Sequence, residues 1–134
     1  MSLVTEWPAD HAAKWANFAP SEMRCKCGCG CLPDPEFMGW MQKVRLAYAM
    51  PMRITSAARC QRHNIAIKGA TESMHLQGLA ADIAVNGPAA MKLIGVAIRG
   101  GVQGLGLKQH GPQAGRIVHL DIGPRETPTC WTYP

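Results

Sequence analysis

The sequence predicts an α+β fold in which a small antiparallel sheet packs against two main helices. Two observations indicate this class: two segments have helix start or stop signals, and four short segments have strand-like apolar patterns. The chain has 134 residues, of which 47% are hydrophobic and 17% charged, so it can build one compact core and is not disordered as a whole. We expect residues 1–20 to form an N-terminal arm and residues 21–134 to form a single domain.

The first main helix is predicted to begin directly after Asp34. Asp34 is a favourable N-cap residue, and Pro35 suits the first helical position. The apolar side chains that follow recur at helical spacing and should face the core: Phe37, Met41, Val44 and Tyr48. Pro51 should stop this helix. A second helix is predicted over about residues 89–99, where two glycines at residues 100–101 close it.

Four segments are predicted as strands. Residues 52–56 alternate between apolar and polar side chains, and residues 79–85 form an apolar run that suits a buried strand. Residues 102–107 and 116–122 flank a loop rich in Gly and Pro, which indicates an antiparallel pair joined by a long turn. These segments supply the expected sheet.

Composition and charge narrow the classes of partner. No run approaches 18 consecutive apolar residues, so the sequence predicts no membrane span. Fourteen basic and nine acidic residues give a net charge of +5, which suits an anionic cell wall as well as nucleic acid. The first 20 residues carry Glu6 and Asp10 where a secretory signal would have a basic region, so we expect a cytoplasmic location in the producing cell.

Asp82 is out of place in the apolar run of residues 79–85. A buried and unpaired carboxylate would cost several kcal/mol there, so Asp82 must have a cation or a metal ion as its partner. His75 precedes it in the chain, and Gly78 allows the backbone to turn between the two residues. His75 is therefore the first candidate to share a site with Asp82.

His119 and Asp121 should stand on one face of the last predicted strand, because side chains alternate along a strand. Taken alone, this pair is better explained as a solvated strand face than as part of a site. Together, however, His75, Asp82 and His119 offer two imidazole nitrogens and one carboxylate oxygen. That set suits a tetrahedral zinc ion whose fourth position is open to water, so the sequence predicts a catalytic zinc site.

Four ordered motifs carry a resemblance to a known family. Residues 73–82 match the pattern S-x-H-x-x-G-x-A-x-D, and residues 118–124 match V-H-x-D-x-G-P. Residues 53–64 are similar to R-I-T-S-G-Y-R-C-x-x-H-N, and residues 21–30 to S-E-F-x-C-K-C-G-C-G. The chain thereby resembles the zinc D-Ala-D-Ala carboxypeptidase family, which includes phage endolysins and bacterial D-Ala-D-Ala dipeptidases and shares its fold with the hedgehog signalling domain.

The resemblance implies a role for five residues. By it, His75, Asp82 and His119 are the zinc ligands. It also implies that Arg59 holds the carbonyl or carboxylate of the substrate and that Ser73 lines the substrate pocket. The implied reaction is the hydrolysis of an amide bond by a water molecule that the zinc ion activates.

The sequence departs from the family pattern in two places. Two alanines at residues 57–58 replace Gly-Tyr before Arg59, which removes an aromatic wall of the pocket. Many relatives carry the catalytic carboxylate three residues before the last histidine, but here Arg116 holds that position. We expect Asp121 to act as the general base instead, because alternation aims it to the same side as His119.

The six cysteines leave two interpretations open. Four of them crowd into residues 25–31, where neighbours two positions apart are hard to bridge to each other. One interpretation is a thiolate cluster that holds a second, structural metal ion, formed by Cys25, Cys27, Cys29 and Cys60. The other is plain thiols, or a disulfide that reaches Cys60 or Cys130.

The preferred function is that of a zinc metallopeptidase that hydrolyses an amide bond in the stem peptides of peptidoglycan, as a carboxypeptidase or an endopeptidase of the endolysin type. The absence of an export signal agrees with an enzyme that reaches the cell wall after release or as a virion component. We expect a monomer that binds peptidoglycan and no nucleic acid. The alternative is a non-catalytic, zinc-stabilised binding module with a degenerate peptidase pocket.

Overall fold

A five-stranded sheet forms the centre of the protein in the computed structural model, which describes residues 2–134. The strand order is β1-β2-β4-β3-β5. The strands are β1 (Arg53–Ser56), β2 (Ala80–Ala84), β3 (Gly104–Lys108), β4 (Ile117–Asp121) and β5 (Thr129–Thr132). Neighbours pair antiparallel except β3 and β5, which are parallel, so the sheet is mixed.

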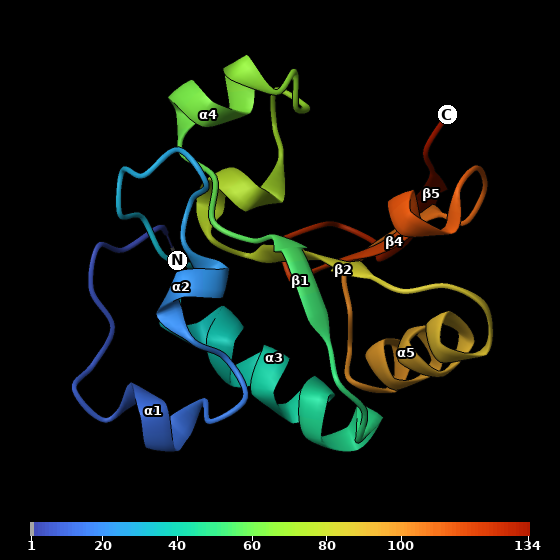
Figure 1. Cartoon of the computed structure of the whole chain (residues 1–134), viewed down its shortest axis with the longest axis horizontal. Coiled ribbons are helices and arrows are strands. Elements are labelled where there is room, and N and C mark those ends of the chain that lie inside the picture. The colour runs from blue at the N-terminus through green and yellow to red at the C-terminus, as the bar shows by residue number, and fades with distance from the viewer. Residues whose placement is uncertain (1) are drawn as a thin grey trace.

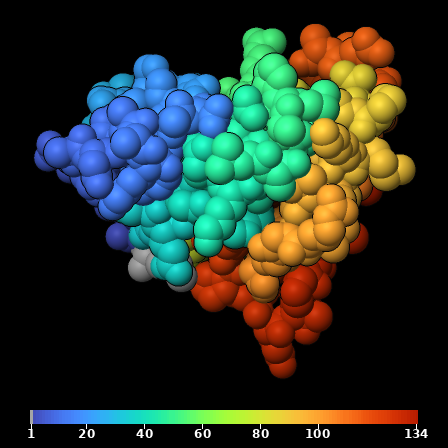
Figure 2. Space-filling view, turned by 90° about the horizontal axis from the view of Figure 1, so that it is seen from below, coloured from blue at the N-terminus to red at the C-terminus, as the bar shows by residue number. Residues whose placement is uncertain are grey.

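Two long helices cover one side of this sheet, below it in Figure 1. The α-helices are α1 (His11–Lys14), α2 (Pro20–Met23), α3 (Pro35–Tyr48), α4 (Gln61–Ala66) and α5 (Gly87–Arg99). Two short 3-10 helices complete the set, η1 (Met74–Gln77) and η2 (Gln113–Gly115). Seen from below in Figure 2, the segment of α3 lies between the N-terminal residues and α5. The predicted α+β class with two main helices is confirmed, whereas the sheet that was expected to be antiparallel is mixed, because β5 pairs in parallel with β3.

The helix after Asp34 forms for the reasons that the sequence suggests. The Asp34 carboxylate accepts a hydrogen bond from the backbone N–H of Glu36 at 2.8 Å, which caps the first turn of α3. The helix ends at Tyr48, before it reaches Pro51. Ala49 ends it by adopting a left-handed conformation with φ of 59°. The predicted apolar stripe is buried in the core.

The alternation along β2 and β4 divides the sheet into a core face and a site face. Ala81 pairs with Leu120 and Ile83 with Val118, and all four are buried in the hydrophobic core. The residues between them have their side chains on the opposite face, where polar groups gather. The sheet therefore has an apolar side under α3 and α5 and a polar side that carries the site.

The N-terminal segment contributes side chains to the core. The side chains of Trp7, Trp15 and Phe18 are all buried in the main hydrophobic cluster. The indole N–H of Trp7 donates to the carbonyl oxygen of Pro33 at 3.0 Å, next to the start of α3. The described part of the predicted arm, residues 2–20, is thus anchored to the rest of the protein by these side chains and by a hydrogen bond from the backbone N–H of Ser2 to Asp34.

Several short elements lie outside the sequence predictions. The strand β5, the four-residue helices α1 and α2, and both 3-10 helices have too few residues for a readable periodicity. Among residues 2–134, no helix combines the length and the apolar composition that crossing a lipid bilayer requires.

Candidate metal centre

Direct strand pairing places Asp82 beside His119. The two residues are partners across the antiparallel ladder of β2 and β4, so their side chains leave the same face of the sheet as neighbours. Asp121 lies two residues further along β4, on the same face, opposite Ala80. The pairing explains why one carboxylate interrupts the apolar run of β2: only alternate residues of that strand face the core.

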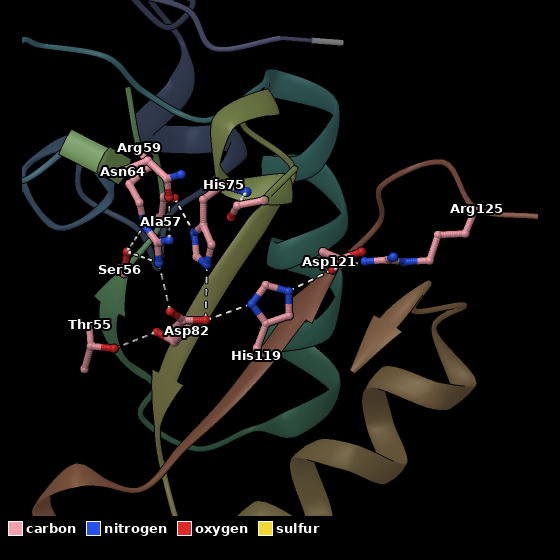
Figure 3. A network of polar contacts seen from close by, with 11 residues as sticks. Thr55, Ser56, Ala57, Arg59, Asn64, His75, Asp82, His119, Asp121 and Arg125 are labelled. Atoms are coloured by element: carbon pink, nitrogen blue, oxygen red, sulfur yellow. Dashed lines mark hydrogen bonds and ion pairs between the residues drawn. The ribbon is translucent and has the colours of Figure 1, made fainter. Parts of the chain in front are cut away.

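A short 3-10 helix brings His75 to the same place. The Ser73 hydroxyl accepts a hydrogen bond from the backbone N–H of His75 at 3.2 Å and caps η1. Gly78 then adopts φ of 71° and returns the chain to β2. A Cβ atom at Gly78 would lie 2.7 Å from the backbone nitrogen of Asp34, so this turn requires glycine. Figure 3 shows His75 above Asp82 and His119 as a result.

Both imidazole rings have one nitrogen engaged and the other directed at Asp82. In His75, Nδ1 lies 2.7 Å from the carbonyl oxygen of Ala57, which can only accept, so Nδ1 carries the proton and Nε2 has a free lone pair. In His119, Nε2 lies 2.7 Å from Asp121 Oδ2, and Nδ1 faces Asp82. The free nitrogens of His75 and His119 lie 3.2 Å and 2.9 Å from the same oxygen, Asp82 Oδ1.

This donor set fits a zinc ion. The ligand atoms that His75, Asp82 and His119 offer all lie within 4.8 Å of one another. Two imidazole nitrogens and a carboxylate oxygen are typical zinc ligands. Each histidine also has an outer acceptor that fixes its ring, Ala57 for one and Asp121 for the other, as histidines that bind metals almost always do.

Electrostatics favour a cation at this position. Burial alone would raise the pKa of Asp82, but hydrogen bonds with His119 and His75 outweigh it and hold that pKa far below its usual range. Burial likewise opposes ionisation of Asp121, yet His119 and Arg125 lower its pKa. Burial would lower the pKa of His119, but Asp121 and Asp82 on either side raise it. Two ionised carboxylates thus surround the site at neutral pH.

Arg59 adjoins the three candidate ligands. Its Nη2 lies 3.4 Å from Asp82 Oδ2, the oxygen that the histidines do not contact. Its other contacts are the Ser56 hydroxyl, reached at 3.3 Å and 3.2 Å, and Asn64 Oδ1 at 3.1 Å. These bonds fix the guanidinium plane, and a guanidinium has five N–H donors, so donor capacity remains for a substrate group.

Asp121 is the most enclosed carboxylate of the site. Its side chain has no exposed surface, and its oxygens accept hydrogen bonds from His119 at 2.7 Å, Arg125 at 2.8 Å and the backbone N–H of Gly123 at 3.2 Å. Gly104 on β3 pairs with Asp121, and a Cβ atom there would overlap the carboxylate. Figure 3 shows the resulting line of contacts from Asp82 through His119 and Asp121 to Arg125.

The site opens into a cavity of about 410 Å³ with an aromatic side. Trp131 and Tyr133 line it from β5 and the residue after it, and the Trp131 ring lies 5.2 Å from the ring of His119. Gly106 pairs with His119, and a Cβ atom there would come within 2.7 Å of the Trp131 indole. This wall was missed by the sequence analysis, although the segment Thr129–Thr132 has the β-branched and aromatic residues that strands favour.

The site residues predicted from the sequence lie around one cavity. The structure brings His75, Asp82 and His119 together, and Arg59 and Ser73 line the same cavity. Asp121 also lines the cavity, whereas Arg116, three residues before His119, donates to the carbonyl oxygen of Gly111 instead. Four of the six cysteines form a second group of potential metal ligands: Cys25, Cys27, Cys29 and Cys60.

Comparison with known proteins gives one match. A family model described as Peptidase M15 matches residues 16–121, which is more than half of the chain and includes all three candidate zinc ligands. No curated protein matches the sequence at a significant level.

Proposed function

The chain belongs to the peptidase M15 family, and from this premise we propose that it is a zinc-dependent peptidase that hydrolyses an amide bond in the stem peptides of peptidoglycan. One observation carries the proposal: His75, Asp82 and His119 converge in a cavity, and an outer acceptor fixes each imidazole in the tautomer that leaves a ligand nitrogen free. The net charge of +5 agrees with an anionic cell-wall substrate.

We assign zinc to His75 Nε2, His119 Nδ1 and the Asp82 carboxylate. When bound, the ion polarises the scissile carbonyl and lowers the pKa of a bound water molecule to about 7. These three residues line the cavity, so a zinc ion that they held would be accessible to water and substrate, as catalytic zinc sites require. Asp82 also forms an ion pair with Arg59, and this contact keeps the second carboxylate oxygen of Asp82 in place.

Arg59 binds the anionic part of the substrate in this proposal. Arg59 is only 8% exposed and lines the cavity next to Asp82. Hydrogen bonds to Ser56 and Asn64 hold its guanidinium in place. From there it either pairs with a carboxylate of the stem peptide or stabilises the oxyanion that forms on the carbonyl. Trp131 and Tyr133 line the same cavity and offer the peptide an aromatic contact.

Besides the proposed ligand Asp82, two carboxylates line the cavity and could accept the proton, Glu72 and Asp121. The role of Asp121 as general base stays a prediction, but its buried oxygens already accept three hydrogen bonds, which suits a residue that positions His119. Glu72 lines the same cavity and is exposed to solvent. We therefore propose that Asp121 acts through His119 and that Glu72 accepts the proton from water.

Paired amide substitutions separate these two roles. We expect Glu72→Gln to keep full zinc content and to lower kcat by about 10²–10⁴-fold, because a general base is removed. We expect Asp121→Asn to weaken zinc binding by about 10–100-fold, because His119 loses its charged acceptor. Zinc titration and kcat against pH check both. If Asp121→Asn keeps its zinc affinity but loses turnover, while Glu72→Gln behaves as wild type, Asp121 is the base.

The proposed function is tested by the loss of turbidity of purified peptidoglycan, with and without a zinc chelator. We expect clearing or fragment release by the wild-type protein, its loss on chelation and its return when zinc is added back. Mass analysis of the released fragments then identifies the bond that is cut. Binding to peptidoglycan with no released fragment, at full zinc content, would instead support the non-catalytic binding module.

A further inference from the structure

A tight loop gathers three of the cysteines on one side. The backbone N–H of Cys25 donates to the carbonyl oxygen of Cys31 at 2.9 Å and closes the loop. Gly28 and Gly30 adopt φ of 85° and 88°, a conformation that glycine tolerates without strain. With these turns, the sulfur atoms of Cys25, Cys27 and Cys29 lie within 4.8 Å of one another.

The fourth sulfur comes from a distant part of the chain. Cys60 is the N-cap residue of α4, and its Sγ accepts the backbone N–H of His63 at 3.4 Å. The backbone N–H of Cys60 itself donates to Cys25 Sγ at 3.4 Å. Backbone N–H groups directed at sulfur favour the thiolate form, which is the form that binds a metal ion.

The spacing of the sulfurs suits a metal ion better than a disulfide. Cys27 Sγ lies 3.5 Å from both Cys25 Sγ and Cys60 Sγ. A disulfide requires about 2.05 Å between its sulfurs. Four thiolates around zinc, each about 2.3 Å from the metal, lie about 3.8 Å from one another at the corners of a tetrahedron. The two separations of 3.5 Å are close to this tetrahedral edge, and all the other sulfur pairs of the group stay within 4.8 Å.

We propose that Cys25, Cys27, Cys29 and Cys60 bind one zinc ion as a closed, structural site, separate from the peptidase centre. Four protein ligands leave no position for water, so this site has no catalytic task. Its surroundings are basic: Arg62 lies beside Cys27, Arg24 precedes the loop, and Lys26 lies within it. These cations offset the net negative charge that four thiolates and one zinc ion carry.

The site fastens the cysteine loop to the segment that supports the peptidase centre. Cys60 follows Arg59, whose guanidinium contacts Asp82. Two residues further back, the carbonyl oxygen of Ala57 accepts from His75 Nδ1, and the backbone N–H of Arg59 donates to the carbonyl oxygen of His75 at 3.2 Å. Zinc at the cysteines thus holds residues 57–60 in register with His75. This consequence rests on the proposed function, whereas the metal site does not.

The test is metal content and cobalt spectroscopy of the purified full-length chain and single variants. We expect about two zinc ions per wild-type chain, about one in Cys27→Ser and about one in His119→Ala. After cobalt substitution, thiolate-to-cobalt charge-transfer absorption should appear in the wild type and in His119→Ala and vanish in Cys27→Ser. Cys130→Ser is the matched control, because Cys130 is exposed on β5 outside the group, and it should keep both ions.

Three outcomes would overturn the proposal: cobalt-loaded wild type without the charge-transfer band, equal zinc content in Cys27→Ser and Cys130→Ser, or thiol counts that show the four cysteines paired as disulfides. The wild-type spectrum remains decisive even if Cys27→Ser fails to fold. Failure of the proposed function has a different signature, since the histidine site would then lack metal or activity while the thiolate band persists.

Discussion

Replacing His119 by alanine is expected to remove the zinc ion from the peptidase centre and to lower turnover of peptidoglycan fragments by about 10³-fold or more. The variant loses one of three zinc ligands. It also leaves Asp82 and Asp121 without the imidazole that lies between them and contacts both. A metal ion contributes several kcal/mol to transition-state stabilisation, which corresponds to this loss of rate.

The effect of His119→Ala is checked by measuring zinc content and kcat on the same preparation. His11→Ala is the matched control, because His11 lies on α1 against Trp7 and outside the cavity. The control should keep zinc and activity. A His119→Ala protein that stays folded, retains its full zinc content and turns over substrate at the wild-type rate would mean that His119 is not a ligand.

Replacing Arg59 by alanine is expected to lower kcat/KM by about 10²–10³-fold while zinc remains bound, because the principal cationic donor beside the metal site is lost. Arg59→Lys should recover only part of the activity. A lysine ammonium keeps the charge, but it cannot span Ser56, Asn64 and Asp82 with a planar fork of donors.

The measurement for Arg59 compares kcat and KM on two stem-peptide substrates, one with a free terminal carboxylate and one with that carboxylate amidated. If Arg59 anchors a carboxylate, amidation costs the wild type much more than it costs Arg59→Ala. If it stabilises the oxyanion, both substrates lose kcat equally in the variant. Arg53→Ala on the exposed side of β1 is the control and should match wild type. Wild-type kinetics in Arg59→Ala would exclude both roles.

The main elements of the fold could be predicted because their signals are local. Asp34 and Pro35 mark the start of α3, and alternation or apolar runs mark β2 and β4. The strand β5 escaped prediction because four residues pair in parallel with β3 across a long separation in the chain. Tertiary contacts decide whether so short a segment becomes a strand.

The candidate metal site could be predicted for the same reason, and its surroundings could not. Asp82 is conspicuous in an apolar run, and the strand period places Asp121 on the side of His119. No sequence pattern shows that the carbonyl oxygen of Ala57 fixes His75, since every residue has such a group. Likewise, the saturation of Asp121 depends on Arg125 and on a backbone N–H, which only the folded chain brings together.

Anomalous diffraction at the zinc absorption edge, from crystals of the wild-type chain, tests the central claim most directly. We predict an anomalous peak in contact with His75 Nε2, His119 Nδ1 and an Asp82 oxygen, with Ala57 and Asp121 still hydrogen-bonded to the opposite ring nitrogens. A map from a zinc-replete crystal with no peak between these three side chains, or with the two histidines turned away from Asp82, would contradict the assignment.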